Sequence, residues 1–405
     1  VNERHALKLC KKRRFVFCIC HYPNAGDFNN YRKKAGDLSN LKSIMETLMQ
    51  YNQPNSAIYS HMFTNNHDKP SVLHTMPLNM SVYMAKDMKE LDDSTKKSIL
   101  KLIGQPEANF DKIYKTICPK AVGVGLAMQE VINKSNYSDA DKQKLTEALT
   151  KLVNGQKPSG GKNSYKRAES FGVKPYEITI KDLFRYAGMN PSDDNVLKFH
   201  YSMLKDSMNY YERLWQVMNA CVGTPTLFAG GEFAQTGYET PSKNVYLGIR
   251  NEVMHDLANC DNANYNYKKY YDKMYRTSSL YKLPGMSALR DGAPISLEMT
   301  DNKTFSMWPV YKKDAKGSEV VSVITNLGLP NGKASFETRS NDTIKQMVDS
   351  IAIVDKDGRC PFEDGIKLSR VGDNKTYIVE NGKIVLKGGK IELTDTVINF
   401  FKYNI

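Results

Sequence analysis

The sequence has no apolar run long enough to cross a membrane. Its longest uninterrupted apolar stretches are Phe15 to Cys20 and Val222 to Gly230, whereas a membrane-spanning helix needs about 20 such residues. No secretory signal segment is visible, and the chain begins at Val1, which indicates that the native start is missing or was removed. We therefore expect no membrane partner and make no prediction of cellular location.

Cysteines are few and follow no metal-binding or disulfide pattern. There are seven, an odd number, and they are scattered at Cys10, Cys18, Cys20, Cys118, Cys221, Cys260 and Cys360. Structural zinc sites need cysteines or histidines at short fixed spacings, and disulfide-rich modules need an even set in a short chain. We expect mostly free, buried thiols and no metal site.

Acidic residues are outnumbered by basic ones, 44 against 57, which gives a net charge of +13. Such an excess would attract polyanions. The basic residues, however, are spread through amphipathic segments such as Met88 to Leu102 and Lys142 to Lys151, where a solvated helix face explains them. The one dense run, Lys11 to Arg14, is only four residues long. Without a motif that would place a helix or a stacking platform on a strand of DNA or RNA, we expect no nucleic-acid partner.

The first 80 residues alternate between helical and strand-like patterns. Arg4 to Lys12 and Leu38 to Tyr51 have helical periodicity, whereas Arg14 to Cys20 and Ala57 to Phe63 are apolar and strand-like. Helices that alternate with strands are typical of parallel βα units. We therefore predict an α/β arrangement over residues 1–80.

A helical insertion and linker are predicted over residues 81–164. The pattern is helical and polar-faced to Val153, and Asn154 to Ser164 has the composition of a flexible linker. Residues 165–294 then contain a long amphipathic helix, Asn195 to Val222, followed directly by the strand-like Thr224 to Ala229. A helix and a strand of the α/β part therefore return after the insertion.

An all-β domain, a sandwich, is predicted over residues 295–405. Helical periodicity largely disappears there, and short alternating runs take over at residues 304–311, 319–326, 376–380, 383–386 and 396–401. Asn381-Gly382 stands between two of these runs and is the strongest short hairpin signal in the chain.

The polar segment Asn66-His67-Asp68 follows the second predicted strand. At the carboxyl end of a parallel strand, such side chains can face a ligand. Asp68 could stabilise a developing cation, and His67 could donate a hydrogen bond to a hydroxyl group. An Asx-rich turn that caps the next element explains the same residues equally well.

Three segments resemble the alpha-amylase family, glycoside hydrolase family 13. Phe63 to Asp68 is similar to the strand-7 signature of that family, which ends in Asn-His-Asp after an aromatic residue. Gly223 to Glu232 resembles the strand-8 signature, Gly-x-Pro followed by an apolar run, Gly, any residue and Glu. Ser287 to Gly292 is similar to the Leu-Arg turn that leads into the C-terminal β domain. Two such motifs in the right order on predicted strands are more specific than either alone.

The resemblance implies a fold and a set of roles. The fold would be a partial (β/α)8 TIM barrel, represented by its last strands, with a large helical insertion and then the β-sandwich. Asp68 would be the acidic residue that stabilises the transition state, and His67 and Asn66 would bind substrate. Glu232 would be mainly structural. Some members bind calcium, but no oxygen-rich loop resembling a calcium site is seen in this chain.

The resemblance also implies a retaining reaction on α-glucosidic linkages, for which a nucleophile and an acid are required. The nucleophile signature of the family, Gly-x-Arg-x-Asp, is found nowhere in the chain. Glu3 is the sole candidate for the acid. We therefore expect the C-terminal portion of a larger amylase-like glycosidase or transglycosidase, with a starch- or glycogen-type glucan as partner and no cofactor. The alternative is a non-catalytic homologue that binds α-glucan.

Overall fold

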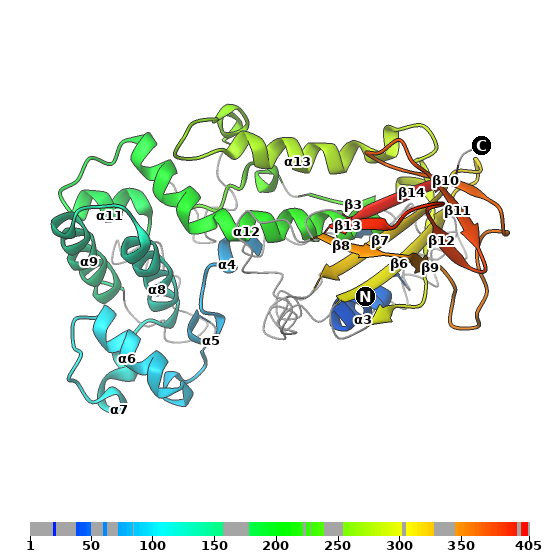
Figure 1. The fold of residues 1–405 in the computed structure, drawn as a ribbon. Coiled ribbons are helices and arrows are strands. Elements are labelled where there is room, and N and C mark those ends of the chain that lie inside the picture. Colours follow the sequence, from blue (N-terminus) through cyan, green and yellow to red (C-terminus); the bar gives the residue numbers. More distant parts are fainter. Residues whose placement is uncertain are drawn as a thin grey trace. The chain divides into compact units, whose positions relative to one another are not determined.

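The computed structural model describes residues 19–21, 38–49, 60–62, 72–83, 85–156, 178–221, 224–227, 229–238, 254–301, 305–327, 345–394 and 398–403. They combine helices with strands, as the sequence predicted, and divide into two compact units (Figure 1). The β-rich unit contains the described residues of Val1–Thr64, Asn209–Leu227 and Asp272–Ile405. The helical unit contains those of Asn65–Met208 and Phe228–Tyr271. No helix in these ranges has the length and apolar character of a membrane span.

A three-stranded parallel sheet in the β-rich unit joins segments that are far apart in the chain. Its strands are β1 (Ile19–His21), β2 (Ser60–Met62) and β3 (Thr224–Pro225), in the order β1-β2-β3. Both pairings are parallel. The parallel pairing was predicted from the alternation of helices and strands and is confirmed. In the chain, α3 (Leu38–Met49) comes between β1 and β2, and its residues Leu38, Leu41 and Met45 are buried.

The rest of the β-rich unit is antiparallel. A curled nine-stranded sheet has the order β4-β6-β7-β14-β10-β11-β12-β9, with β5 added beside β6 (Figure 1). Strands β8 and β13 form a separate antiparallel pair. The strands are β4 (Ala293–Ser296), β5 (Thr300–Asp301), β6 (Phe305–Lys313), β7 (Glu319–Leu327), β8 (Lys345–Val348), β9 (Ser350–Ala352), β10 (Lys367–Arg370), β11 (Thr376–Glu380), β12 (Lys383–Val385), β13 (Ile391–Thr394) and β14 (Asn399–Tyr403). The described residues of 295–405 form strands and turns, which agrees with the predicted all-β character.

One apolar core serves both antiparallel sheets. Ile391 and Leu393 of β13 are fully buried in the same cluster as Val321 and Val323 of β7 and Phe401 of β14. Burial of this much apolar surface is what holds the two sheets together.

The hairpin predicted at Asn381-Gly382 is confirmed, because these two residues join β11 to β12. Their φ angles are 49° and 70°, so both adopt the left-handed region that a type I′ turn requires. A Cβ atom at Gly382 would lie 2.7 Å from Cγ1 of Val354.

We therefore expect Gly382→Ala to lower the free energy of unfolding of the β-rich unit by about 2 kcal/mol, through left-handed strain and this clash. Asn381→Gly is the control and should leave stability within about 0.5 kcal/mol, because glycine accepts a positive φ. Urea unfolding can be followed by tryptophan fluorescence, since both tryptophans, Trp215 and Trp308, belong to this unit. Equal stability of Gly382→Ala and wild type would contradict the prediction.

The helical unit is built from short helices around one core. The helices are α4 (Val72–Thr75), α5 (Met80–Tyr83), η2 (Met88–Glu90), α6 (Asp93–Leu102), α7 (Phe110–Ile113), η3 (Tyr114–Thr116), α8 (Pro119–Lys134), α9 (Asp139–Asn154) and α11 (Ile180–Tyr186). Side-chain caps from Asp92, Ser138 and Thr179 begin α6, α9 and α11 by satisfying free backbone N–H groups. The helical character predicted for residues 81–153 agrees with these elements. Most of the predicted linker, from residue 157 on, lies outside the described residues.

The long helix predicted at Asn195 to Val222 is α12 (Asp193–Cys221). Its residues to Met208 belong to the helical unit and the others to the β-rich unit. The chain continues through η4 (Gly231–Phe233), η5 (His255–Asn259), α13 (Tyr267–Ser279), η6 (Leu280–Lys282) and α14 (Ala288–Asp291).

Candidate functional site

The predicted site residues Asn66, His67 and Asp68 lie outside the described residues, as does Glu3. The chain reaches the Asn-His-Asp segment four residues after β2, the central strand of the parallel sheet. The predicted strand-8 signature begins at β3, next to β2 in the same sheet. The first signature therefore follows β2, and the second contains its parallel neighbour β3.

The end of the strand-8 signature forms a tight loop in the helical unit. Gly230 has a φ of 97°, and its carbonyl accepts hydrogen bonds from the N–H groups of Phe233 and Gln235. Glu232 folds back on this turn, where Oε2 accepts the N–H of Gly230 at 2.9 Å. The carboxylate is thus a hydrogen-bond acceptor for the backbone of its own loop.

The pKa of Glu232 is raised, chiefly because partial burial disfavours the charged carboxylate. Hydrogen bonds from backbone N–H groups and the charge of His255 oppose this shift without cancelling it. Glu232 is therefore a carboxyl group whose ionisation is shifted toward neutral pH. The structural role that the resemblance implies for it remains a prediction.

A buried polar cluster surrounds the far end of the same loop. His200 lies between the hydroxyl groups of Thr236, 2.8 Å from Nε2, and Tyr267, 2.6 Å from Nδ1. The Tyr267 hydroxyl also contacts the carbonyl oxygen of Leu197, at 3.1 Å. The ring of His200 is fully buried.

His74 holds the same threonine through its backbone. Its Nδ1–H donates to the carbonyl of Thr236 at 3.1 Å, and its ring stacks on Tyr238 with centroids 4.2 Å apart. Sequence reasoning missed this cluster. His74, His200, Thr236 and Tyr267 are far apart in the chain and share no spacing that could have signalled their contact.

The third predicted motif, the Leu-Arg turn, is α14 and lies in the β-rich unit. The carbonyl of Leu289 accepts a hydrogen bond from Nζ of Lys312 at 2.7 Å. Ser287 donates to the carboxylate of Asp314, which belongs to the β6–β7 hairpin. Arg290 is held by Asp291 and stacks over Tyr281, 4.5 Å from the ring centroid. The contacts of Leu289 and Ser287 fix the turn to the antiparallel sheet.

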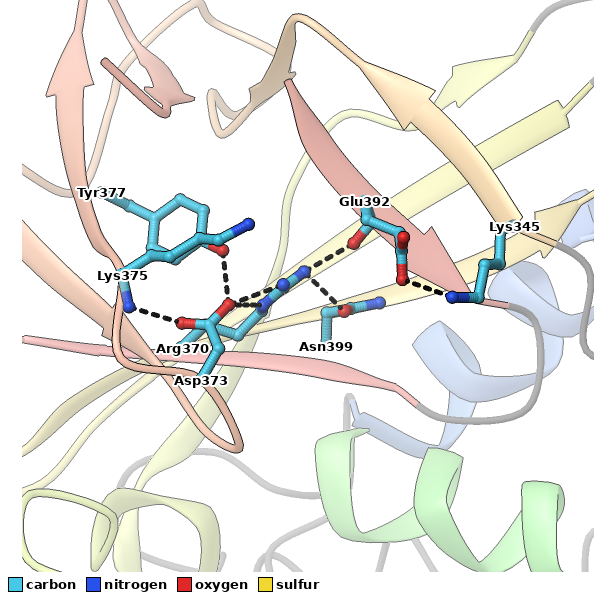
Figure 2. Close-up of polar contacts among 7 residues, drawn as sticks. All are labelled: Lys345, Arg370, Asp373, Lys375, Tyr377, Glu392 and Asn399. Carbon is cyan, nitrogen blue, oxygen red and sulfur yellow. Dashed lines mark hydrogen bonds and ion pairs between the residues drawn. The ribbon is translucent and has the colours of Figure 1, made fainter. Parts of the chain in front are cut away.

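A second polar cluster lies among the C-terminal strands (Figure 2). Arg370 of β10 donates to Asp373 at 2.7 Å, to the carbonyl of Glu392 on β13 and to Oδ1 of Asn399 on β14. Tyr377 of β11 also donates to Asp373, at 2.7 Å. One guanidinium group thereby connects three strands and a turn, which is a structural role.

Desolvation by itself would raise the pKa of Asp373, but hydrogen bonds from Tyr377, the Lys375 N–H and Arg370 together lower it. Every one of these donors belongs to the cluster itself. The carboxylate is therefore engaged in holding the strands.

No group of histidine, cysteine, aspartate or glutamate side chains among the described residues is arranged to hold a metal ion. Cys118, Cys221, Cys260 and Cys360 are free, and two of these four are buried. Free thiols were predicted, and for these four positions the prediction is confirmed.

Comparison with known proteins found no match for the chain among family models or among curated protein sequences. The resemblance to the alpha-amylase family therefore rests on the three sequence segments.

Proposed function

We propose that the chain is the C-terminal portion of an alpha-amylase-like enzyme that cleaves or transfers α-glucosidic linkages of starch- or glycogen-type glucans with retention. The observation that carries the proposal is the pairing of β2 with β3. One signature segment follows β2 and the other contains β3, and these two strands are parallel neighbours in one sheet, in the order that the resemblance requires. Side chains that follow neighbouring parallel strands meet at one edge of a sheet, where substrates of such folds bind.

In this proposal β1, β2 and β3 are the last three strands of a (β/α)8 barrel, and residues 81–164 are an insertion into it. The antiparallel sheets that follow α14 are the C-terminal β-sandwich. The shared core of β13 with β7 and β14 supports that assignment, because a sandwich buries the inner faces of two sheets against each other.

Asp68 is proposed to stabilise the charge that develops at the anomeric carbon, and His67 and Asn66 to bind hydroxyl groups of the sugar. A retaining reaction also needs a carboxylate that attacks the anomeric carbon and an acid that protonates the departing oxygen. The chain lacks the nucleophile signature. In this proposal the nucleophile and the acid belong to strands 4 and 5 of the parent enzyme.

The test is Asp68→Asn in the longer parent protein, assayed as release of reducing ends from soluble starch. We expect turnover to fall at least about a hundredfold, because the change removes a charge directed at the transition state. Asp111→Asn, at an exposed position of α7, is the matched control and should leave turnover unchanged. Near wild-type turnover of Asp68→Asn would contradict the role of Asp68.

The same assay on the 405-residue chain separates the alternatives. Activity that Asp68→Ala abolishes would place the nucleophile and the acid within these residues, with Glu3 the first candidate for the acid. A folded but inactive chain from an active parent supports the proposal. A parent that binds amylopectin in affinity electrophoresis without cleaving it would favour the non-catalytic homologue.

A further inference from the structure

The loop from Ala229 to Tyr238 follows β3 in the chain, but its described contacts are with the helical unit. Tyr238, at the end of the loop, is 2% exposed and belongs to the apolar core that contains Phe184 and Phe199. Its backbone carbonyl accepts the N–H of Ile180, at the start of α11, at 2.8 Å. The loop therefore ends inside the core of the inserted helices.

Thr236 is held from two sides by buried side chains of separate helices. His200 of α12 contacts its hydroxyl group, and His74 of α4 contacts its carbonyl oxygen. The Tyr238 hydroxyl donates to the carbonyl of His74 at 2.7 Å and completes the connection. Buried polar groups held in this way have one arrangement, because any displacement leaves a partner without its hydrogen bond.

The beginning of the loop is held as well. The Tyr270 hydroxyl of α13 donates to the carbonyl of Gly231 at 2.8 Å, and the ring of Phe233 stacks on Tyr271. Oε1 of Gln235 accepts the N–H of Met254 at 3.0 Å. Other residues of the helical unit thus contact the loop at its start, middle and end.

We propose that the helices α4, α11, α12 and α13 hold the loop Ala229–Tyr238 as a brace and that His200 is its positioning residue, acting through the hydroxyl group of Thr236. The role of the brace in fixing the loop does not depend on which reaction the protein catalyses. Its consequence for catalysis rests on the proposed function, in which the loop follows the last barrel strand in the chain. The helices that contact the loop would then fix the conformation of the residues that come after this strand.

Two substitutions of His200 separate positioning from simple stabilisation. Glutamine carries an amide near the Nε2 position, which faces Thr236, whereas asparagine carries one near Nδ1, which faces Tyr267. Each retains one of the two contacts. Hydrogen–deuterium exchange of the whole chain, without substrate, reports the opening of the loop and of the helices separately.

We expect His200→Asn to raise amide exchange in residues 229–238 at least about tenfold, and His200→Gln less than about threefold. Amides of α8 and α9 should keep wild-type rates in both variants. Equal effects of the two substitutions, no effect of either, or faster exchange throughout α6 to α9 would overturn the brace.

Thr236→Val provides an independent check should either histidine variant fail to fold. It removes the hydroxyl group that His200 contacts and should raise exchange of the loop by the same factor as His200→Asn. Thr150→Val is the matched control, because the Thr150 hydroxyl donates to the carbonyl of Leu102 away from the loop. If the parent cleaves starch but the substitutions do not change exchange of the loop, the brace alone is refuted. If the substitutions change exchange as expected but the parent does not cleave starch, the proposed function alone is refuted.

Discussion

Replacing Arg370 by methionine is expected to lower the free energy of unfolding of the β-rich unit by about 3 kcal/mol. The side chains of Arg370 and Asp373 are only 13% and 18% exposed. Methionine fills a similar volume but leaves the Asp373 carboxylate without its cation, and it removes the donors to Glu392 and Asn399. Removing one partner of a mostly buried ion pair destabilises a protein far more than replacing the whole pair by apolar residues does.

Arg359→Met is the matched control. Arg359 also contacts two carboxylates, those of Asp355 and Asp357, but its side chain is 73% exposed. Ion pairs at such positions contribute less than about 1 kcal/mol. Urea unfolding followed by tryptophan fluorescence measures both variants.

The double variant Arg370→Met/Asp373→Leu tests the explanation itself. The single substitution leaves the Asp373 carboxylate unpaired in a mostly buried site, and the double variant removes that carboxylate. The free energy of unfolding should therefore be partly restored. If Arg370→Met and Arg359→Met lose the same small amount, the cluster in Figure 2 does not hold the strands together.

The local elements of this fold could be predicted from the sequence because their signals are local. Asn381-Gly382 marks a type I′ turn since few other residues accept a positive φ. The run predicted at residues 376–380 is β11, and α12 differs from its predicted bounds by only a residue or two at each end. Alternation with period two and apolar spacing near 3.6 residues identify such elements without knowledge of their partners.

Pairings between distant strands were not predictable in this way. Nothing in the runs that became β8 and β13 indicates that they leave the main sheet and pair with each other. The His74–His200–Thr236 cluster is likewise assembled by packing, from residues with no common spacing. At the predicted site, the Asn-His-Asp motif gives residue types but no geometry, and its role stays a prediction.

Lys312 and Lys313 are adjacent on β6, and the sequence does not show that only one of them is buried. The buried lysine leads to the largest effect on stability that we expect. Alternation places adjacent residues on opposite faces but does not say which face is covered. Lys313 pairs with Glu319 and is exposed, whereas Lys312 is 0% exposed. Its Nζ donates to the carbonyl of Asn219, in the last turn of α12, as well as to that of Leu289. Helix carbonyls that need a donor explain why a lysine is buried there.

Burial lowers the pKa of Lys312 from 10.5 to about 7, because desolvation penalises the charged amine more than nearby Cys221 favours it. Between about pH 7 and 10.5 the unfolded chain therefore binds a proton at this residue that the folded chain does not. Stability must rise with pH across this window, and below it the cost of the buried cation is constant. The full shift corresponds to about 5 kcal/mol at 1.36 kcal/mol per pKa unit.

Lys312→Met removes this group, so the free energy of unfolding of wild type minus that of the variant should increase by several kcal/mol from pH 6.5 to pH 10. The difference between the proteins is the quantity to measure, since other lysines and tyrosines titrate in both. Lys313→Met is the control on the same strand, and Glu319 raises the pKa of that exposed lysine. Its difference from wild type should be small and should decline as pH rises, the opposite sign. Urea unfolding followed by tryptophan fluorescence gives the free energy of unfolding of each protein at each pH. If the values for wild type and Lys312→Met change with pH in parallel, Lys312 stays charged in the folded protein and the carbonyls around it fully compensate its burial.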